Sequence, residues 1–127
     1  MKYNWQDKKV LIVEDNTSNY VLLKSILLLT KIRYTWVESG LTAIEICKNE
    51  HFDLIFMDIQ LPEFDGYETT AAIREFNKEV PIIVVTAYAF ESHKNKAYEY
   101  LCNDFIIKPL KSQEIHNVMA KYLEKNS

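Results

Sequence analysis

The sequence predicts an α/β fold, a single doubly wound (βα)5 sandwich of three layers built on a parallel sheet. Five short apolar runs, rich in β-branched and aromatic residues, recur at fairly even spacing along the 127 residues. Segments with helical spacing and helix start signals lie between these runs. Strand and helix therefore alternate five times, and crossovers of this length build a doubly wound sheet.

The expected strands are residues 10–13, 34–37, 54–57, 82–85 and 105–107. Four of them are nearly continuous in apolar residues and do not alternate with polar ones. This pattern is typical of a parallel sheet that is covered by helices on both faces.

Three of the expected helices begin at a recognisable cap. Ser39 is expected to cap the second helix, and Ser112 is expected to cap the last one. Asp65 and Glu68 have the spacing of a capping box at the start of the third helix. The leucine-rich residues 20–29 predict a first helix with more apolar surface than one buried face can hide.

Length and composition limit the classes of protein to consider. A chain of 127 residues fits one domain spanning residues 1–127, with a core at about 9–123. The formal net charge of −3 and the pI of about 5.6 give no basic field for direct nucleic-acid binding. Residues 20–29 are too few for a membrane span, and neither a secretion signal nor a disulfide framework is indicated, so a cytoplasmic protein is expected.

Polar residues follow the expected strands at the edge where functional groups gather in open α/β sheets. Glu14 and Asp15 follow the first strand, Asp58 the third, Thr86 the fourth and Lys108 the fifth. With strand order 2-1-3-4-5, the first and third strands are neighbours, so the three carboxylates converge. Converging acids repel unless a cation lies among them, and hard oxygen ligands favour Mg²⁺, or Mn²⁺, over zinc.

This group of residues has the chemistry needed to accept a phosphoryl group. A carboxylate beside a metal can act as a nucleophile toward phosphorus, which makes Asp58 the candidate acceptor. Lys108 offers a positive charge to a phosphoryl oxygen, and Thr86 offers a hydroxyl donor. Pro109 follows Lys108 and permits a cis peptide bond that would aim the lysine inward.

Four stretches resemble the response-regulator receiver family, whose fold is flavodoxin-like. They read VLIVEDN from Val10, MDIQLP with DG from Met57, VVTA from Val84, and DFIIKP from Asp104. Each would be weak alone, but four in the correct order at strand ends are highly specific. The resemblance covers roughly residues 9–123, and the strand order used above is that of the family's chemotaxis member.

The resemblance assigns a role to each site residue. It implies Mg²⁺ bound by Glu14, Asp15, Asp58 and the backbone carbonyl of Gln60, with Asp58 as the phosphoacceptor. It implies that Thr86 and Lys108 bind the phosphoryl group, and that Thr86 and Phe105 form the conformational switch. Phe105 has no hydroxyl with which to hold either position of that switch.

The resemblance also implies partners and a mode of action. The phosphoryl donor would be a phosphohistidine on a histidine kinase or on a histidine phosphotransfer domain. The residues of the motifs are most similar to those of receivers that belong to hybrid sensor histidine kinases. The domain would catalyse only its own phosphorylation and dephosphorylation. The exposed remainder of residues 20–29 is expected to dock the donor helices. Dimerisation, stimulus, cognate kinase and output stay open.

Alternatives remain for most of these residues taken singly. Acids after a strand are often solvated turn or cap residues, and a lone threonine or lysine is usually a strand former or a surface charge. The histidines, His51, His93 and His116, are expected at the surface, and Cys47 and Cys102 in the core. Tyr88, Tyr98 and Tyr100 are expected either to line an output face or simply to pack.

Three other functions compete with phosphoacceptance. A phosphohydrolase that uses an aspartyl phosphate usually has a second acid two residues after the nucleophile, where this chain has Gln60. A nucleotide- or flavin-binding module should have a glycine-rich loop after the first strand, but the only glycines are Gly40 and Gly66. A degenerate receiver would lack part of the acidic set.

One departure from the family pattern concerns the turn before the fifth strand. Tyr100 and Leu101 stand where many members have Ala-Gly, so this turn must form without glycine.

Overall fold

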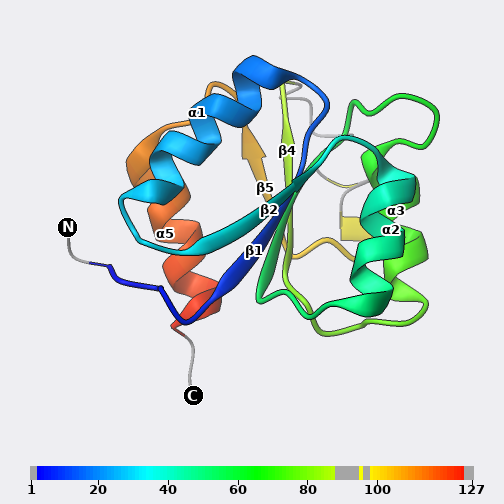
Figure 1. Ribbon diagram of the computed structural model, residues 1–127. Coiled ribbons are helices and arrows are strands. Elements are labelled where there is room, and N and C mark those ends of the chain that lie inside the picture. Colours follow the sequence, from blue (N-terminus) through cyan, green and yellow to red (C-terminus); the bar gives the residue numbers. More distant parts are fainter. Residues whose placement is uncertain (1–2, 88–94, 96–97, 125–127) are drawn as a thin grey trace.

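The computed structural model describes residues 3–87, 95 and 98–124. Its five strands form one parallel sheet in the order β2-β1-β3-β4-β5, which confirms the predicted fold and topology. The strands are β1 (Lys9–Val13), β2 (Arg33–Val37), β3 (Leu54–Asp58), β4 (Ile82–Thr86) and β5 (Asp104–Ile107). Figure 1 shows α1 (Thr17–Leu28) and α5 (Ser112–Leu123) on one face, and α2 (Gly40–Asn49) and α3 (Gly66–Arg74) on the other. The helix expected between β4 and β5 lies largely outside the described residues.

Local sequence signals explain where α2 and α3 begin. Ser39 caps α2 by accepting a hydrogen bond from the backbone N–H of Thr42. Asp65 and Glu68 form the predicted capping box of α3. The prediction for α5 was wrong, because Ser112 is already helical and the cap position is occupied by Lys111, which makes no side-chain cap hydrogen bond.

Two hydrophobic clusters fill the space between the sheet and its helices. Every residue of β3 and β4 is buried, so the middle of the sheet forms the shared centre of the core. Leu11, Ile55 and Val84 pack toward α2 and α3, whereas Ile12, Phe56 and Ile83 pack toward α1 and α5. This alternation along each strand lets one continuous apolar run fill both layers.

The histidines and cysteines differ in how deeply the structure buries them. Cys47 and Cys102 are free and buried, as predicted. His51 is exposed, but the prediction that His116 lies at the surface was wrong. The His116 side chain is 4% exposed, and its Nε2 lies 3.0 Å from the carbonyl oxygen of Ile26, because a buried imidazole can satisfy a helix carbonyl of α1. His93 lies outside the described residues.

The turn into β5 forms without glycine by using a left-handed residue. Leu101 has a φ of 69° and is 60% exposed. Tyr100 packs against Tyr67, with ring centroids 5.5 Å apart, whereas Tyr98 is exposed. Tyr88, the third tyrosine considered for an output face, lies outside the described residues. Tyr100 is thus a packing residue, and the backbone strain of the turn falls on Leu101.

The outer face of α1 is apolar, as its composition predicted. Val21, Leu22, Leu28 and Leu29, on α1 and its C-terminal cap, are each between 42% and 55% exposed. Leu23, Ile26 and Leu27 form the buried face of the same helix. Among the described helices, none combines the length and the apolar character that a membrane crossing requires.

Candidate phosphoryl-acceptor site

The candidate site lies at the carboxyl ends of β1 and β3, two neighbouring strands of the sheet. Val13 is paired with Met57, so the next residues along the two strands, Glu14 and Asp58, lie side by side. The crossover connections leave β1 and β3 on opposite faces, which opens the rim of the sheet at this point. Parallel pairing alone therefore brings together two acids that are 44 positions apart in the sequence.

The structure brings three predicted carboxylates together. One ligand oxygen from each of Glu14, Asp15 and Asp58 lies within 4.8 Å of the others. Glu14 is 6% exposed and Asp58 is 4% exposed, whereas Asp15 faces solvent. A cation placed among them would therefore have two buried ligands and one open side from which water or substrate can approach.

Burial and the neighbouring Asp58 both act on the pKa of Glu14. Burial, followed by the hydrogen bond and the charge of Asp58, raises the pKa of Glu14 from its ordinary 4.5 to about 7. The Lys108 ammonium and the Asn16 backbone N–H, which donates to Glu14 Oε2 at 3.1 Å, act in the opposite direction. The positive charge of Lys108 therefore only partly offsets the effect of burial and of Asp58 on the pKa of Glu14.

Lys108 supplies the positive charge predicted for the site. Its Nζ lies 3.4 Å from Glu14 Oε1 and 3.6 Å from Asp58 Oδ2. The backbone N–H of Lys108 donates to the carbonyl of Thr86 at 2.6 Å, which continues the β4–β5 ladder, and the Lys108–Pro109 peptide bond is cis. The lysine therefore reaches the acids from the far side of β4.

Thr86 and Phe105 lie on the same face of the sheet. Thr86 is the last residue of β4 and is fully buried. Phe105 pairs with Val84, two residues before Thr86, and its half-buried ring packs with the cluster under α2 and α3. Side chains two apart on a strand share a face, so a movement of one can reach the other.

The loop after β3 is built closely around the acceptor. The Gln60 backbone N–H donates to Asp58 Oδ1 at 3.1 Å, and Gln60 itself is an exposed residue. A Cβ on Gly66 would collide with the carbonyl oxygen of Asp58, so only glycine fits there. The carboxylate of Asp58 is thereby oriented by its own loop.

The donor set fits a hard divalent cation. All three side-chain ligands are carboxylates, and among the described residues they form the only cluster of three or more acid, histidine or cysteine side chains that could hold a metal ion. Mg²⁺ prefers oxygen ligands and keeps several waters, which suits a group with one exposed side.

Comparison with known proteins identifies the family. The sequence profile of the response regulator receiver domain matches residues 10–120, which is most of the chain. The chain belongs to the response-regulator receiver family. The receiver is 42% identical over 118 residues to the autoinducer 2 sensor kinase/phosphatase LuxQ of Vibrio vulnificus, and 31% identical over 119 residues to the sensor histidine kinase GacS of Pseudomonas protegens.

These alignments cover 92% and 90% of the receiver but only 14% and 13% of the two relatives, which are far longer. Among solved structures, the receiver domain of a sensor histidine kinase from Pseudomonas aeruginosa is similar, at 31% identity and a TM-score of 0.87 over 93% of this chain and 98% of that one. That structure has a magnesium ion in its active site cleft.

A second similar structure contains a partner. The receiver domain of the Saccharomyces cerevisiae response regulator Ssk1 is 35% identical, with a TM-score of 0.85 over 91% of this chain and 88% of that one. It was crystallised with the histidine phosphotransfer protein Ypd1.

One contact at the site has no signal in the sequence. Trp36 of β2 donates a hydrogen bond from its indole N–H to the backbone carbonyl of Glu14 at 2.7 Å. In the sequence, Trp36 reads only as an aromatic strand residue, and nothing local indicates that it lies against the acidic pair. Only the pairing of β2 with β1 brings the two residues together.

Proposed function

We propose that this receiver accepts a phosphoryl group on Asp58 in a magnesium-dependent reaction and uses it to switch contacts with other proteins. The observation that carries the proposal is the buried Asp58 carboxylate, which lies with two further acids within 4.8 Å and with Lys108 Nζ at 3.6 Å. A nucleophile, a place for a divalent cation and a positive charge for phosphoryl oxygens are together what phosphoryl transfer needs.

Each residue has a defined part in this proposal. Glu14, Asp15, Asp58 and the carbonyl oxygen of Gln60 would hold Mg²⁺, or Mn²⁺ in its place, and the cation would neutralise charge on the phosphoryl oxygens. A carboxylate oxygen of Asp58 attacks phosphorus while the bond to the donor imidazole nitrogen breaks. The released imidazole takes up a proton, so the products are an aspartyl phosphate and a neutral histidine.

The remaining site residues would convert this event into a structural change. Lys108 and Thr86 would bind phosphoryl oxygens, which draws the Thr86 hydroxyl toward Asp58. Phe105, on the same face of the sheet, would then turn into the space that Thr86 leaves. This step is supported by the buried position of Thr86 and the partial burial of Phe105.

The proposed donor is a phosphohistidine on a histidine kinase or a phosphotransfer domain. The apolar stripe of α1, formed by Val21, Leu22, Leu28 and Leu29, offers a surface for the donor helices. The complex of the similar yeast receiver with its phosphotransfer protein supports this choice of partner. The similarity to sensor kinases supports a place for the domain, with its core at about 9–123, within a cytoplasmic hybrid kinase.

The domain would act only on itself and would not turn over external phosphate esters. Gln60, an exposed amide residue, lies two residues after Asp58. Phosphohydrolases that form an aspartyl phosphate usually have an acid at this position. Without an acid to protonate a leaving group, small phosphate esters should not be hydrolysed at an appreciable rate. A turnover assay with such esters separates the two functions.

The decisive experiment is phosphorylation by acetyl phosphate and Mg²⁺, read by mass spectrometry of the intact protein. The wild type should gain one phosphoryl group, and Asp58→Asn should gain none, because the amide is not a nucleophile. Asp65→Asn is a matched control, since asparagine caps a helix as well as aspartate does. Stable labelling of Asp58→Asn, or loss of labelling in both variants, would refute the proposal.

A further inference from the structure

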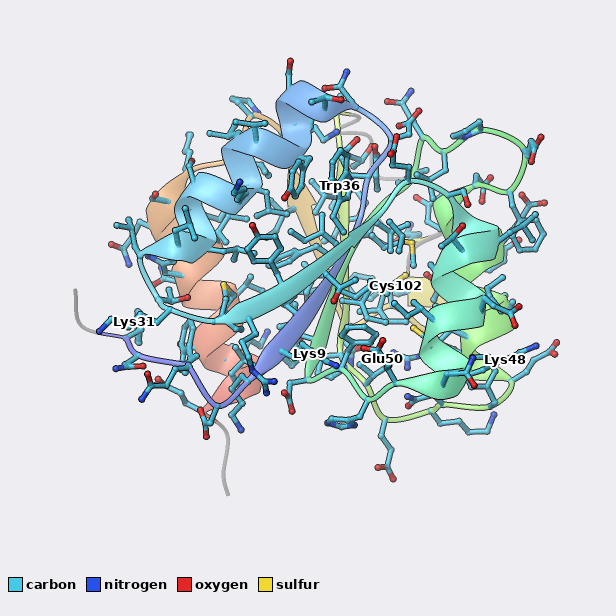
Figure 2. The ribbon with its side chains drawn as sticks, in the orientation of Figure 1. Lys9, Lys31, Trp36, Lys48, Glu50 and Cys102 are labelled. Carbon is cyan, nitrogen blue, oxygen red and sulfur yellow. The ribbon has the colours of Figure 1, made fainter. Side chains whose placement is uncertain are left out.

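The loop that carries two of the proposed metal ligands is held at its first residue by β2. The indole N–H of Trp36 donates to the carbonyl oxygen of Glu14 at 2.7 Å, and the backbone N–H of Glu14 donates to Val37 at 3.1 Å. Both polar groups of the Glu14 backbone are therefore engaged by consecutive residues of one strand. In Figure 2, Trp36 lies beside α1, at the opposite end of the sheet from Lys9 and Glu50.

The same indole is packed against the helix that follows the loop. Trp36 and Tyr20 stack with ring centroids 3.7 Å apart and an angle of 7° between the planes. Tyr20 is tied to the end of the loop, because its backbone N–H donates to the carbonyl of Asn16 at 3.0 Å. Trp36 thus holds the Glu14 carbonyl at the start of the loop, while its ring packs against Tyr20 in the first turn of α1, the helix that follows the loop.

The position of the acids depends on this short stretch of backbone. Asp15 is exposed, so side-chain packing does not hold it in place. Glu14 is oriented in part by the N–H of Asn16, which donates to its Oε2 at 3.1 Å. Because the carboxyl groups of Glu14 and Asp58 lie within 4.8 Å of each other, a loop that could relax would let the ligands move apart before a cation arrives.

We propose that Trp36 is a positioning residue of the metal site: through its hydrogen bond to Glu14 and its stack on Tyr20, it holds the acidic loop in the conformation that binds Mg²⁺. The inference rests on the proposed magnesium-dependent function. The physical basis is preorganisation, because a loop already in its binding conformation does not lose further freedom when the cation binds. The indole takes no part in the chemistry.

The test is Mg²⁺ affinity, measured by calorimetric titration on the purified domain without any phosphodonor. Trp36→Phe removes the N–H but keeps an aromatic ring against Tyr20. Loss of a hydrogen bond that orients metal ligands should weaken Mg²⁺ binding by about tenfold. The same variant should show faster exchange of the Asp15 and Asn16 amide hydrogens in the metal-free protein, because the loop is less firmly held.

The chain offers a matched control in its other tryptophan. Trp5 is buried, and its indole N–H donates to Glu124 Oε2 at 2.8 Å, a contact that involves none of the proposed ligands. Trp5→Phe is the same substitution with the same loss of an indole hydrogen bond. It should lower stability and leave Mg²⁺ affinity unchanged, which separates positioning from a general loss of stability.

The two tryptophans also give a spectroscopic readout. The sequence contains only Trp5 and Trp36, so Trp5→Phe leaves Trp36 as the single tryptophan fluorophore. Mg²⁺ should change its emission, because the indole bonds directly to the backbone of a proposed ligand. In Trp36→Phe, where Trp5 is the remaining fluorophore, Mg²⁺ should leave the emission unchanged.

A second variant covers the case in which Trp36→Phe does not fold. Tyr20→Leu removes the stacked ring but keeps the indole N–H, and it should weaken Mg²⁺ binding by more than about twofold relative to wild type; unchanged affinity in this variant would count against the inference. Folded Trp36→Phe with affinity within about twofold of wild type would overturn the inference. Equal weakening by Trp5→Phe would also overturn it. Absence of Mg²⁺ binding by the wild type would instead refute the proposed function itself.

Discussion

Glu14→Gln should stabilise the metal-free protein. Glu14 is 6% exposed, and its carboxylate lies beside that of Asp58. Burial and Asp58 raise the pKa of Glu14 to about 7. Glutamine keeps the shape of the side chain and an oxygen that can accept the Asn16 N–H, but it carries no charge.

The size and direction of the effect follow from the pKa of Glu14. Because the pKa in the folded protein is raised from 4.5 to about 7, the protonated carboxyl favours the fold below pH 4.5, and this contribution is lost as the pH rises to about 7. At about 1.4 kcal/mol for each pKa unit, the full penalty is roughly 3 to 4 kcal/mol. Since solvent reaches the rim of the site through Asp15, we expect Glu14→Gln to gain about 2 kcal/mol at pH 8.

The free energy of unfolding should be measured by urea denaturation in the presence of a chelator, from pH 4.5 to pH 8. The difference between Glu14→Gln and wild type should be near zero at the acidic end and should grow until the pH exceeds 7. Glu38→Gln is the matched control, because Glu38 is an exposed acid just after β2. Its substitution should change the free energy of unfolding by less than about 0.5 kcal/mol at every pH.

Saturating Mg²⁺ should reverse the order of the two proteins. The wild type should gain about 2.7 kcal/mol at a hundredfold excess of Mg²⁺ over its dissociation constant, whereas Glu14→Gln should gain much less. A Glu14→Gln protein no more stable than wild type at pH 8 in chelator would refute the electrostatic account of the site. A gain that did not vary with pH would refute its assignment to the Glu14 carboxylate.

Three further substitutions test the scaffold by denaturation at neutral pH. Gly66→Ala should cost about 1 to 3 kcal/mol because the new methyl group collides with the Asp58 carbonyl, and a neutral result would contradict the close packing of the acceptor loop. Leu101→Gly should raise the free energy of unfolding by about 1 kcal/mol, because glycine adopts the left-handed conformation at φ 69° without strain. A decrease of more than about 1 kcal/mol would show that the Leu101 side chain contributes packing. Arg74→Met should lower the free energy of unfolding by about 2 to 4 kcal/mol, because the buried guanidinium donates to the Leu101 carbonyl at 3.0 Å and to Asn103 Oδ1 at 2.8 Å. A loss below about 1 kcal/mol would show that water replaces these bonds.

The fold was predictable because its signals are local and repeated. Continuous apolar runs such as residues 54–57 belong to strands buried on both faces, and the structure buries every residue of β3 and β4. Ser39 and the Asp65–Glu68 pair predicted their caps because each acts on backbone groups within a few residues. Strand order then followed from the family resemblance and from general rules of parallel sheets.

Predictions that depended on distant neighbours were less successful. His116 looked like a surface histidine, but α5 turns it toward the carbonyl of Ile26 on α1. Ser112 looked like a helix cap, but α5 begins one residue earlier than that cap requires. Nothing in the sequence indicated that the Arg74 side chain makes three hydrogen bonds, whose acceptors lie in the segment just after α3 and in the turn before β5.

The sequence by itself determined the alternation of strands and helices, the position of each candidate residue at a strand end and membership in the receiver family. It could do so because residue type and spacing act locally on the backbone, and because strand ends in a parallel sheet share one edge. Only the tertiary structure decided how the pocket is held: Lys108 reaching Glu14 and Asp58 across β4, the burial that raises the pKa of Glu14, and the contact of Trp36 with the Glu14 backbone. These depend on distances between residues far apart in the chain, and those distances are set by packing of the whole sheet.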